Sequence, residues 1–261
     1  MKEQHNLLVP EATYSSLSDK NVIVTGGASG IGEEIVKCFV AQGAKVAFID
    51  NNELAGRSLE RMLSTSRRPP VFQPLDLTDL VAIEPVVTGL IARLGGIDVP
   101  VNNAANDERH TLSEITPAYW RNRMAVNLDH FLFMAKSVVP TMQAAGSGVI
   151  LNMGSCSWRL GLGGMAAYVT AKAAIEGLTN GLARELGAKR IRVNCVIPGF
   201  VRTQRQVEHW LTPQLEATIF NGQCLPDYIQ ASDVANMLTF LASDHARMCT
   251  SGSYTVDGGW I

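Results

Sequence analysis

The chain has 261 residues, a formal net charge of −2 and a sequence pI of about 6.2. Its composition, 46% hydrophobic and 18% charged, is typical of a soluble globular domain with a sizeable core. Basic residues form no run, so nucleic acid is not expected as a partner. Apolar residues form no stretch of the ~18 residues that a membrane helix needs. The five cysteines include no CxxC pair, so the sequence predicts neither a disulfide framework nor a metal site.

The first 18 residues are mostly polar and are interrupted by Pro10. They lack the basic start and the apolar middle of a signal peptide. We therefore expect an N-terminal arm over residues 1–18, in a cytoplasmic protein with reduced thiols.

Short β-branched runs alternate with longer amphipathic stretches along the rest of the chain, a pattern that predicts βαβ units and a parallel sheet. The predicted strands are Asn21–Thr25, Lys45–Ile49, Val71–Leu75, Ile97–Asn102, Gly148–Met153, Arg190–Val196 and Ser253–Val256. The predicted helices are Gly30–Gln42, Asn52–Ser64, Asp79–Leu94, Tyr119–Ala145, Gly164–Leu186 and Ser232–Ala242. The fold class is therefore α/β: one Rossmann-type, doubly wound parallel sheet of about seven strands over residues 19–261, with helices on both faces.

Two segments depart from the alternation. Residues 199–230 follow a strand without continuing the pattern, and we predict that they form a lid over the substrate, because such insertions lie above the ligand crevice. Pro100 falls inside a predicted central strand, where proline supplies no N–H to the sheet.

The first strand runs into a glycine-rich turn and then a helix. Such a turn brings backbone close to a pyrophosphate, and the helix N-terminus offers free N–H groups to that anion. The position between strand and helix makes a dinucleotide site the favoured interpretation over a plain tight turn. The candidate contacts in this turn are Gly26, Ser29, Gly30, Ile31 and Gly32.

Asp50 ends the second strand, where an acid can bind both ribose hydroxyls and repel a 2′-phosphate. Asn51 follows it and no arginine is near. We therefore predict NAD as the preferred cofactor, with NADP weaker. Asp76, after the third strand, is a candidate for the adenine edge. Asp50 could also cap the helix that follows it, which does not exclude the cofactor role, and Asp76 could instead cap the helix that starts near Asp79.

Tyr168 and Lys172 stand four residues apart in a predicted helix, so that both side chains lie on one face. A free tyrosine, with a pKa near 10, is a poor base at neutral pH. A neighbouring ammonium and an oxidised nicotinamide both favour the phenolate. Tyr168 could then remove the proton of a substrate hydroxyl while hydride leaves the same carbon.

Together with the TGGASGIG turn, Asn102–Ala105, Asn127 and Ser155, this pair resembles the short-chain dehydrogenase/reductase family over nearly the whole chain. The resemblance implies that Ser155 binds the substrate oxygen, that Asn127 holds a proton-relay water, that Lys172 also binds the nicotinamide ribose, and that the protein is a homotetramer. Ala105 departs from the glycine usual at its position. The further cofactor contacts are Leu77, Asn103, Ala104, Ala105, Tyr168, Lys172, Pro198, Gly199, Val201 and Thr203.

Several polar and aromatic segments, such as Asn106–His110, Ser157–Leu162 and Arg202–Gln206, resemble bacterial aldopentose 1-dehydrogenases. That resemblance implies oxidation of the C1 hemiacetal of D-xylose or L-arabinose to a lactone. Tryptophan faces suit the C–H faces of a sugar, and polar side chains suit its hydroxyls. The candidate substrate contacts are Asn106, Arg109, Ser155, Trp158, Tyr168, Gln204 and Trp210. A dehydrogenase for another sugar, polyol or secondary alcohol stays open, as does a non-catalytic NAD sensor.

Overall fold

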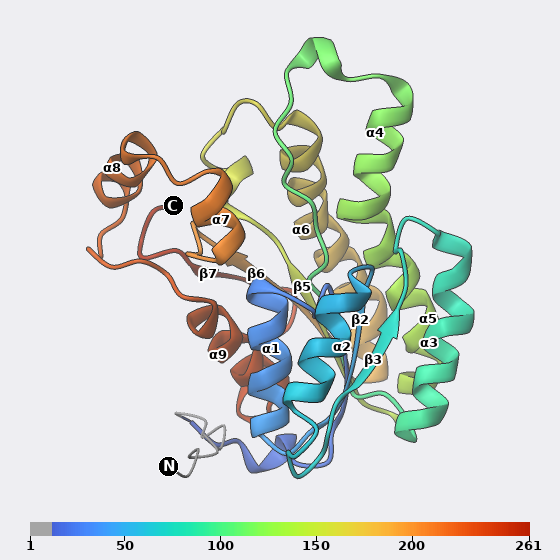
Figure 1. Ribbon diagram of the computed structural model, residues 1–261. Coiled ribbons are helices and arrows are strands. Elements are labelled where there is room, and N and C mark those ends of the chain that lie inside the picture. Colours follow the sequence, from blue (N-terminus) through green and yellow to red (C-terminus); the bar gives the residue numbers. More distant parts are fainter. Residues whose placement is uncertain (1–11) are drawn as a thin grey trace.

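The computed structural model describes residues 12–261, and the first eleven residues of the predicted arm lie outside it. The described residues form a parallel seven-stranded sheet in the order β3-β2-β1-β4-β5-β6-β7, which confirms the predicted fold class (Figure 1). The strands are β1 Asn21–Thr25, β2 Lys45–Asp50, β3 Val71–Pro74, β4 Val99–Asn102, β5 Gly148–Met153, β6 Ile191–Pro198 and β7 Ser253–Val256. Pro100 does lie within β4, opposite Ile23 of β1.

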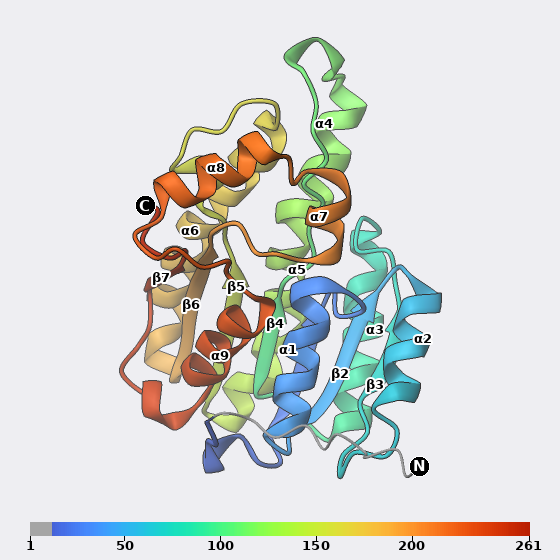
Figure 2. The same cartoon turned by 60° about the vertical axis from the view of Figure 1, so that its left-hand side comes forward.

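Helices cover both faces of the sheet (Figures 1 and 2). They are α1 Gly30–Ala41, α2 Glu53–Met62, α3 Leu80–Leu94, α4 Pro117–Met124, α5 His130–Ala145, α6 Ala166–Leu186, α7 Gln204–His209, α8 Pro213–Gly222 and α9 Ala231–Ala242. Successive strand residues point to opposite faces. Val22 and Val24 therefore pack in one apolar cluster with α1, α2 and α9, while Ile23 packs in a second with α3, α5 and α6. The near-continuous apolar strands thus reflect burial on both faces.

The predicted helix Tyr119–Ala145 is interrupted. A π-helical turn, Ala125–Asp129, separates α4 from α5. The predicted span is helical throughout, and the sequence did not predict the π-turn within it. Such π-turns often occur at functional sites, and this one contains Asn127.

The strand order reverses between β1 and β4, which pair with each other although they are not consecutive along the chain. In open α/β sheets, ligands bind outside the carboxyl ends of the strands at this reversal. Residues 199–230 form α7 and α8 above that edge (Figure 2). A bridge between Val201 and Ile229 joins the two ends of the segment. This is the place expected of a lid, and its role as one stays a prediction.

The part of the predicted arm that the structure describes packs against the domain. Leu17 is fully buried, and the Tyr14 N–H donates to Gln42 Oε1 at 2.8 Å.

Within residues 12–261, no helix is long and apolar enough to cross a membrane. In the same range, no group of three or more His, Cys, Asp and Glu side chains is arranged to hold a metal ion.

Candidate active site

The glycine-rich turn after β1 is held in a tight conformation that needs glycine. Gly26 has a φ of +64°, which is strained for other residues. A Cβ atom on Gly32 would lie 1.8 Å from the Gly26 carbonyl oxygen. The Asn103 side chain donates to the carbonyls of Thr25 and Gly26, at 3.0 Å each. The loop after β4 therefore fixes this turn.

The start of α1 fits the pyrophosphate of a dinucleotide. The helix begins at Gly30, and its N-cap Ser29 makes no side-chain capping bond, so the first N–H groups stay available. Ile31 follows in the first turn. A Cβ atom on Gly30 would lie 3.4 Å from Thr203 Cγ2. The turn thus lies beside the segment after β6, close enough for both to contact one ligand.

Asp50 stabilises the same turn from the end of β2. Its Oδ2 accepts the Ala28 N–H at 3.0 Å, and its Oδ1 accepts the Asn52 N–H at 2.9 Å. Each carboxylate oxygen keeps a lone pair for a ribose hydroxyl. The alternative that Asp50 caps the next helix is wrong, because Asn52 is the N-cap of α2 and accepts from Ala55. Asn51 lies between Asp50 and Asn52 in the chain.

Asp76 does not cap a helix either. Its Oδ1 accepts from the N–H and hydroxyl of Thr78, at 2.9 and 2.8 Å, while Asp79 caps α3. The remaining predicted cofactor residues lie in three loops at the carboxyl ends of strands. These are Asp76 and Leu77 after β3, Asn103, Ala104 and Ala105 after β4, and Pro198, Gly199, Val201 and Thr203 at and after the end of β6.

Tyr168 and Lys172 lie on one face of α6, as predicted from their spacing. The Lys172 side chain is buried, and its Nζ lies 5.5 Å from the centre of the Tyr168 ring. The same Nζ donates to the Met153 carbonyl oxygen at 2.8 Å and lies 5.3 Å from the Phe131 ring centre. The end of β5 and helix α5 thus hold the ammonium close to the phenol.

Burial opposes charge on both members of the pair. It lowers the pKa of Lys172 to about 8, while interactions with Cys195 and Asp107 act in the opposite direction and raise this pKa. Burial raises the pKa of Tyr168, and the charge of Asp107 raises it further, whereas interaction with the Ser155 hydroxyl lowers it. Without a ligand, the pair therefore favours the neutral phenol.

Ser155 ends the loop after β5 and begins a single 3₁₀ turn, Cys156–Trp158. Its Oγ accepts the Ser157 N–H at 3.2 Å and donates to Ser157 Oγ at 2.9 Å. Turn capping is thus one role of this hydroxyl, and its two lone pairs leave room for another. The neighbouring Cys156 is buried, which raises the pKa of its thiol to about 12. A thiol in that state is a poor nucleophile.

Asn127, in the π-turn, is fully buried and pairs with the backbone of Asn106. Its Oδ1 accepts the Asn106 N–H at 2.8 Å, and its Nδ2 donates to the Asn106 carbonyl at 3.1 Å. Both functions of the amide are therefore engaged in holding the loop after β4. A proton-relay water would have to bind the remaining lone pair or the backbone, and this role stays a prediction.

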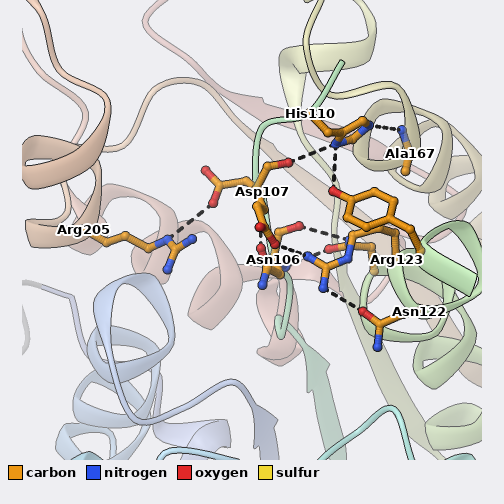
Figure 3. A network of polar contacts seen from close by, with 10 residues as sticks. Asn106, Asp107, His110, Asn122, Arg123, Ala167 and Arg205 are labelled. Atoms are coloured by element: carbon orange, nitrogen blue, oxygen red, sulfur yellow. Dashed lines mark hydrogen bonds and ion pairs between the residues drawn. The ribbon is translucent and has the colours of Figure 1, made fainter. Parts of the chain in front are cut away.

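Asp107 is a site residue that the sequence reasoning missed. Its carboxylate accepts from Gln206 Nε2 at 2.7 Å. It also pairs with Arg205 (Figure 3), whose Nε lies 3.4 Å from Oδ1. Both partners belong to α7, so this contact fastens the segment 199–230 to the loop after β4. Its negative charge also acts on Tyr168 and Lys172. A lone aspartate in a polar loop offered no pattern from which to infer this.

The predicted substrate residues divide into two groups. Arg109 and Trp210 lie together, with the guanidinium 5.1 Å from the indole centre and Nη1 2.9 Å from Met165 Sδ. Trp210 Nε1 is buried and has no partner among the described residues.

Two further predicted contacts, Gln204 and Trp158, have partners of their own. Gln204 donates to Glu208 at 2.7 Å. Trp158 Nε1 donates to Glu176 Oε1 at 2.8 Å, and Arg159 binds the same carboxylate. Among the described residues, the polar and cation–π partners of Trp158 are thus Glu176 and Arg159, which differ from those of Arg109 and Trp210.

Comparison with known proteins identifies the class of protein that this site defines. The family profile described as "Enoyl-(Acyl carrier protein) reductase" matches residues 26–261. The D-xylose 1-dehydrogenase of Caulobacter vibrioides is 49% identical over 249 residues, which span 95% of this chain and 98% of that one. The "probable galactose dehydrogenase" of Rhizobium meliloti is 39% identical over 254 residues, 97% and 99% of the two chains.

A solved structure agrees. A blue fluorescent protein from a metagenomic library, in complex with NADPH, has a TM-score of 0.85 at 33% identity and covers 94% of this chain and 99% of that one. The chain therefore belongs to the short-chain dehydrogenase/reductase family of oxidoreductases, which use NAD or NADP.

Proposed function

We propose that this protein oxidises the C1 hemiacetal of an aldopentose, D-xylose or L-arabinose, to its lactone, with NAD as the preferred cofactor. The observation that carries the reaction class is the buried Lys172 ammonium 5.5 Å from the Tyr168 ring, beside Ser155. The 49% identity to a D-xylose 1-dehydrogenase, across almost all of both chains, supports the sugar.

An oxidised nicotinamide, when bound, would supply the hydride acceptor and a positive ring charge. The protein residues supply the acid–base chemistry. Ser155 orients the C1 oxygen by a hydrogen bond, and Tyr168, as phenolate, takes the proton of the C1 hydroxyl. Lys172 stabilises that phenolate. The C1–H bond breaks with its electron pair, the C1–O bond becomes a carbonyl, and the products are the lactone, the reduced cofactor and the protonated tyrosine.

The lid contacts suit a neutral, polyhydroxylated substrate. Asp107, held by Gln206 and Arg205, offers lone pairs to hydroxyl groups. The Trp210 indole presents a flat apolar surface and a buried N–H that a sugar oxygen could accept.

A panel of sugars tests the substrate. Purified protein and NAD are mixed separately with D-xylose, L-arabinose, D-galactose, D-glucose and L-rhamnose, and NADH absorbance is followed. We expect a pentose to give a kcat/KM at least about tenfold above the hexoses, since one misplaced group in a specific pocket costs that much. If D-galactose is the best substrate, the enzyme is a galactose dehydrogenase and the pentose assignment is wrong; the 39% identity to a probable galactose dehydrogenase is the reason for including this sugar. If the protein oxidises no sugar of the panel, the sugar assignment is wrong altogether.

The cofactor preference is tested at Asp50. We expect wild-type kcat/KM to favour NAD, because the carboxylate would face a 2′-phosphate of like charge. In D50N, which keeps an acceptor for the Ala28 N–H, the NAD-to-NADP ratio should fall by roughly tenfold or more. D79N, at the cap of α3, is the matched control and should leave the ratio unchanged. A wild-type preference for NADP would contradict the proposal.

As part of the same proposal, the enzyme works in the cytoplasm as a homotetramer. The family resemblance supports the assembly, and light scattering on the purified protein measures it.

A further inference from the structure

His110 joins the loop after β4 to the first turn of α6. Its backbone N–H donates to the Gly164 carbonyl at 2.8 Å. Its imidazole is buried, and Nε2 accepts the Ala167 N–H at 3.3 Å (Figure 3). Ala167 directly precedes Tyr168. The N-cap of α6, Met165, makes no side-chain capping bond, so His110 supplies from another segment the acceptor that the helix start lacks.

The contacts of the imidazole show which of its two nitrogens carries the proton. Because Nε2 accepts from a backbone N–H, it carries no proton, and the proton of the neutral ring is on Nδ1. Nδ1 lies 2.9 Å from Tyr119 Oη and 3.2 Å from the Glu108 carbonyl oxygen, and either can accept it. The Tyr119 ring packs edge-on against the imidazole at 5.1 Å. The ring is thus held from three sides with its acceptor toward α6.

The same loop is fixed a few residues earlier, where the Asn127 amide pairs with the Asn106 backbone. Between these two points lie Asp107, which binds α7, and Arg109, which contacts Met165 and Trp210. His110 therefore sets the distance between the loop that carries the candidate substrate contacts and the turn that carries Tyr168.

We propose that His110 is a positioning residue for hydride transfer: its Nε2 holds the first turn of α6 so that the Tyr168 hydroxyl meets a substrate bound by the loop after β4. The inference rests on the proposed function of Tyr168. A displacement of about 1 Å in a reacting group can reduce a rate by about a hundredfold. A cap that served stability alone would instead change the melting temperature and leave kcat unchanged.

Three variants separate these roles. In H110A, we expect kcat to fall by roughly tenfold or more, with the KM for NAD nearly unchanged. H110Q should recover most of the loss, because its side-chain carbonyl can accept the Ala167 N–H. Y119F is the matched control: Nδ1 keeps the Glu108 carbonyl, so kcat should stay near the wild-type value. If H110A does not fold, H110L, which keeps bulk without the acceptor, replaces it.

Amide hydrogen exchange gives a readout independent of turnover. Peptides covering residues 166–172 should exchange faster in H110A than in the wild type, and at the wild-type rate in Y119F. A wild type that oxidises no sugar would end the proposed function but leave this comparison valid, so the two failures are distinguishable. The inference is overturned if H110A keeps its kcat, if H110Q is as slow as H110A, or if exchange in α6 is unaffected.

Discussion

Y168F should lose turnover while keeping the cofactor. We expect kcat to fall by about 10²–10⁴-fold, the usual contribution of a positioned acid–base group. The phenyl ring fills the same half-buried space on α6, so the fold and the NAD dissociation constant should change little. The measurements are NADH formation at saturating sugar and cofactor affinity by calorimetry.

The control for this variant is Y254F, which removes a phenol from β7 at the edge of the sheet. It should keep the wild-type kcat. A Y168F protein that retained more than about a tenth of the wild-type rate would show that another group takes the proton, and the mechanism proposed above would be wrong. Loss of turnover together with loss of NAD binding would instead indicate damage to the site.

The sequence predicted the fold well because burial on both faces of the sheet leaves a local signal. The apolar runs at Asn21–Thr25 and Gly148–Met153 became β1 and β5 with the same bounds. The four-residue spacing of Tyr168 and Lys172 likewise fixed their common face on α6, because helix geometry is local. The π-turn at Ala125–Asp129 is different: it depends on how Asn127 meets the loop after β4, and no local period records that.

The parts of the site that the sequence did not predict are contacts between distant segments. Asp107 and Gln206 are 99 residues apart, and His110 and Ala167 are 57 apart. A lone histidine or aspartate in a polar loop has no periodicity, so only the tertiary structure shows its partner. The capping alternatives for Asp50 and Asp76 failed for a related reason, since several Asp and Asn residues precede each helix and only one can be its N-cap.

The second large effect is expected at Lys172, whose loss should change both the rate and its pH dependence. In the wild type, the rate should rise with pH as the Tyr168–Lys172 pair loses one proton, and the apparent pKa belongs to the pair. Burial lowers the pKa of Lys172 to about 8, so below that pH the ammonium is mostly charged and favours the phenolate. K172M removes this charge at every pH. The rate at pH 7 should therefore fall by about 10²–10³-fold, and the rise with pH should move to more alkaline values.

The measurement is kcat/KM for the best sugar between about pH 6 and 10, with K136M on the exposed side of α5 as the control. The direction in which the pH profile of K172M shifts tests the electrostatic role of Lys172. Burial and the Asp107 charge both raise the pKa of Tyr168, and without the ammonium they are opposed by the Ser155 hydrogen bond and the charge of Arg109. A K172M profile that fell in height without moving would mean that Lys172 acts through binding alone, for example on the cofactor ribose. A profile that moved to more acidic values would contradict the electrostatic coupling of the pair.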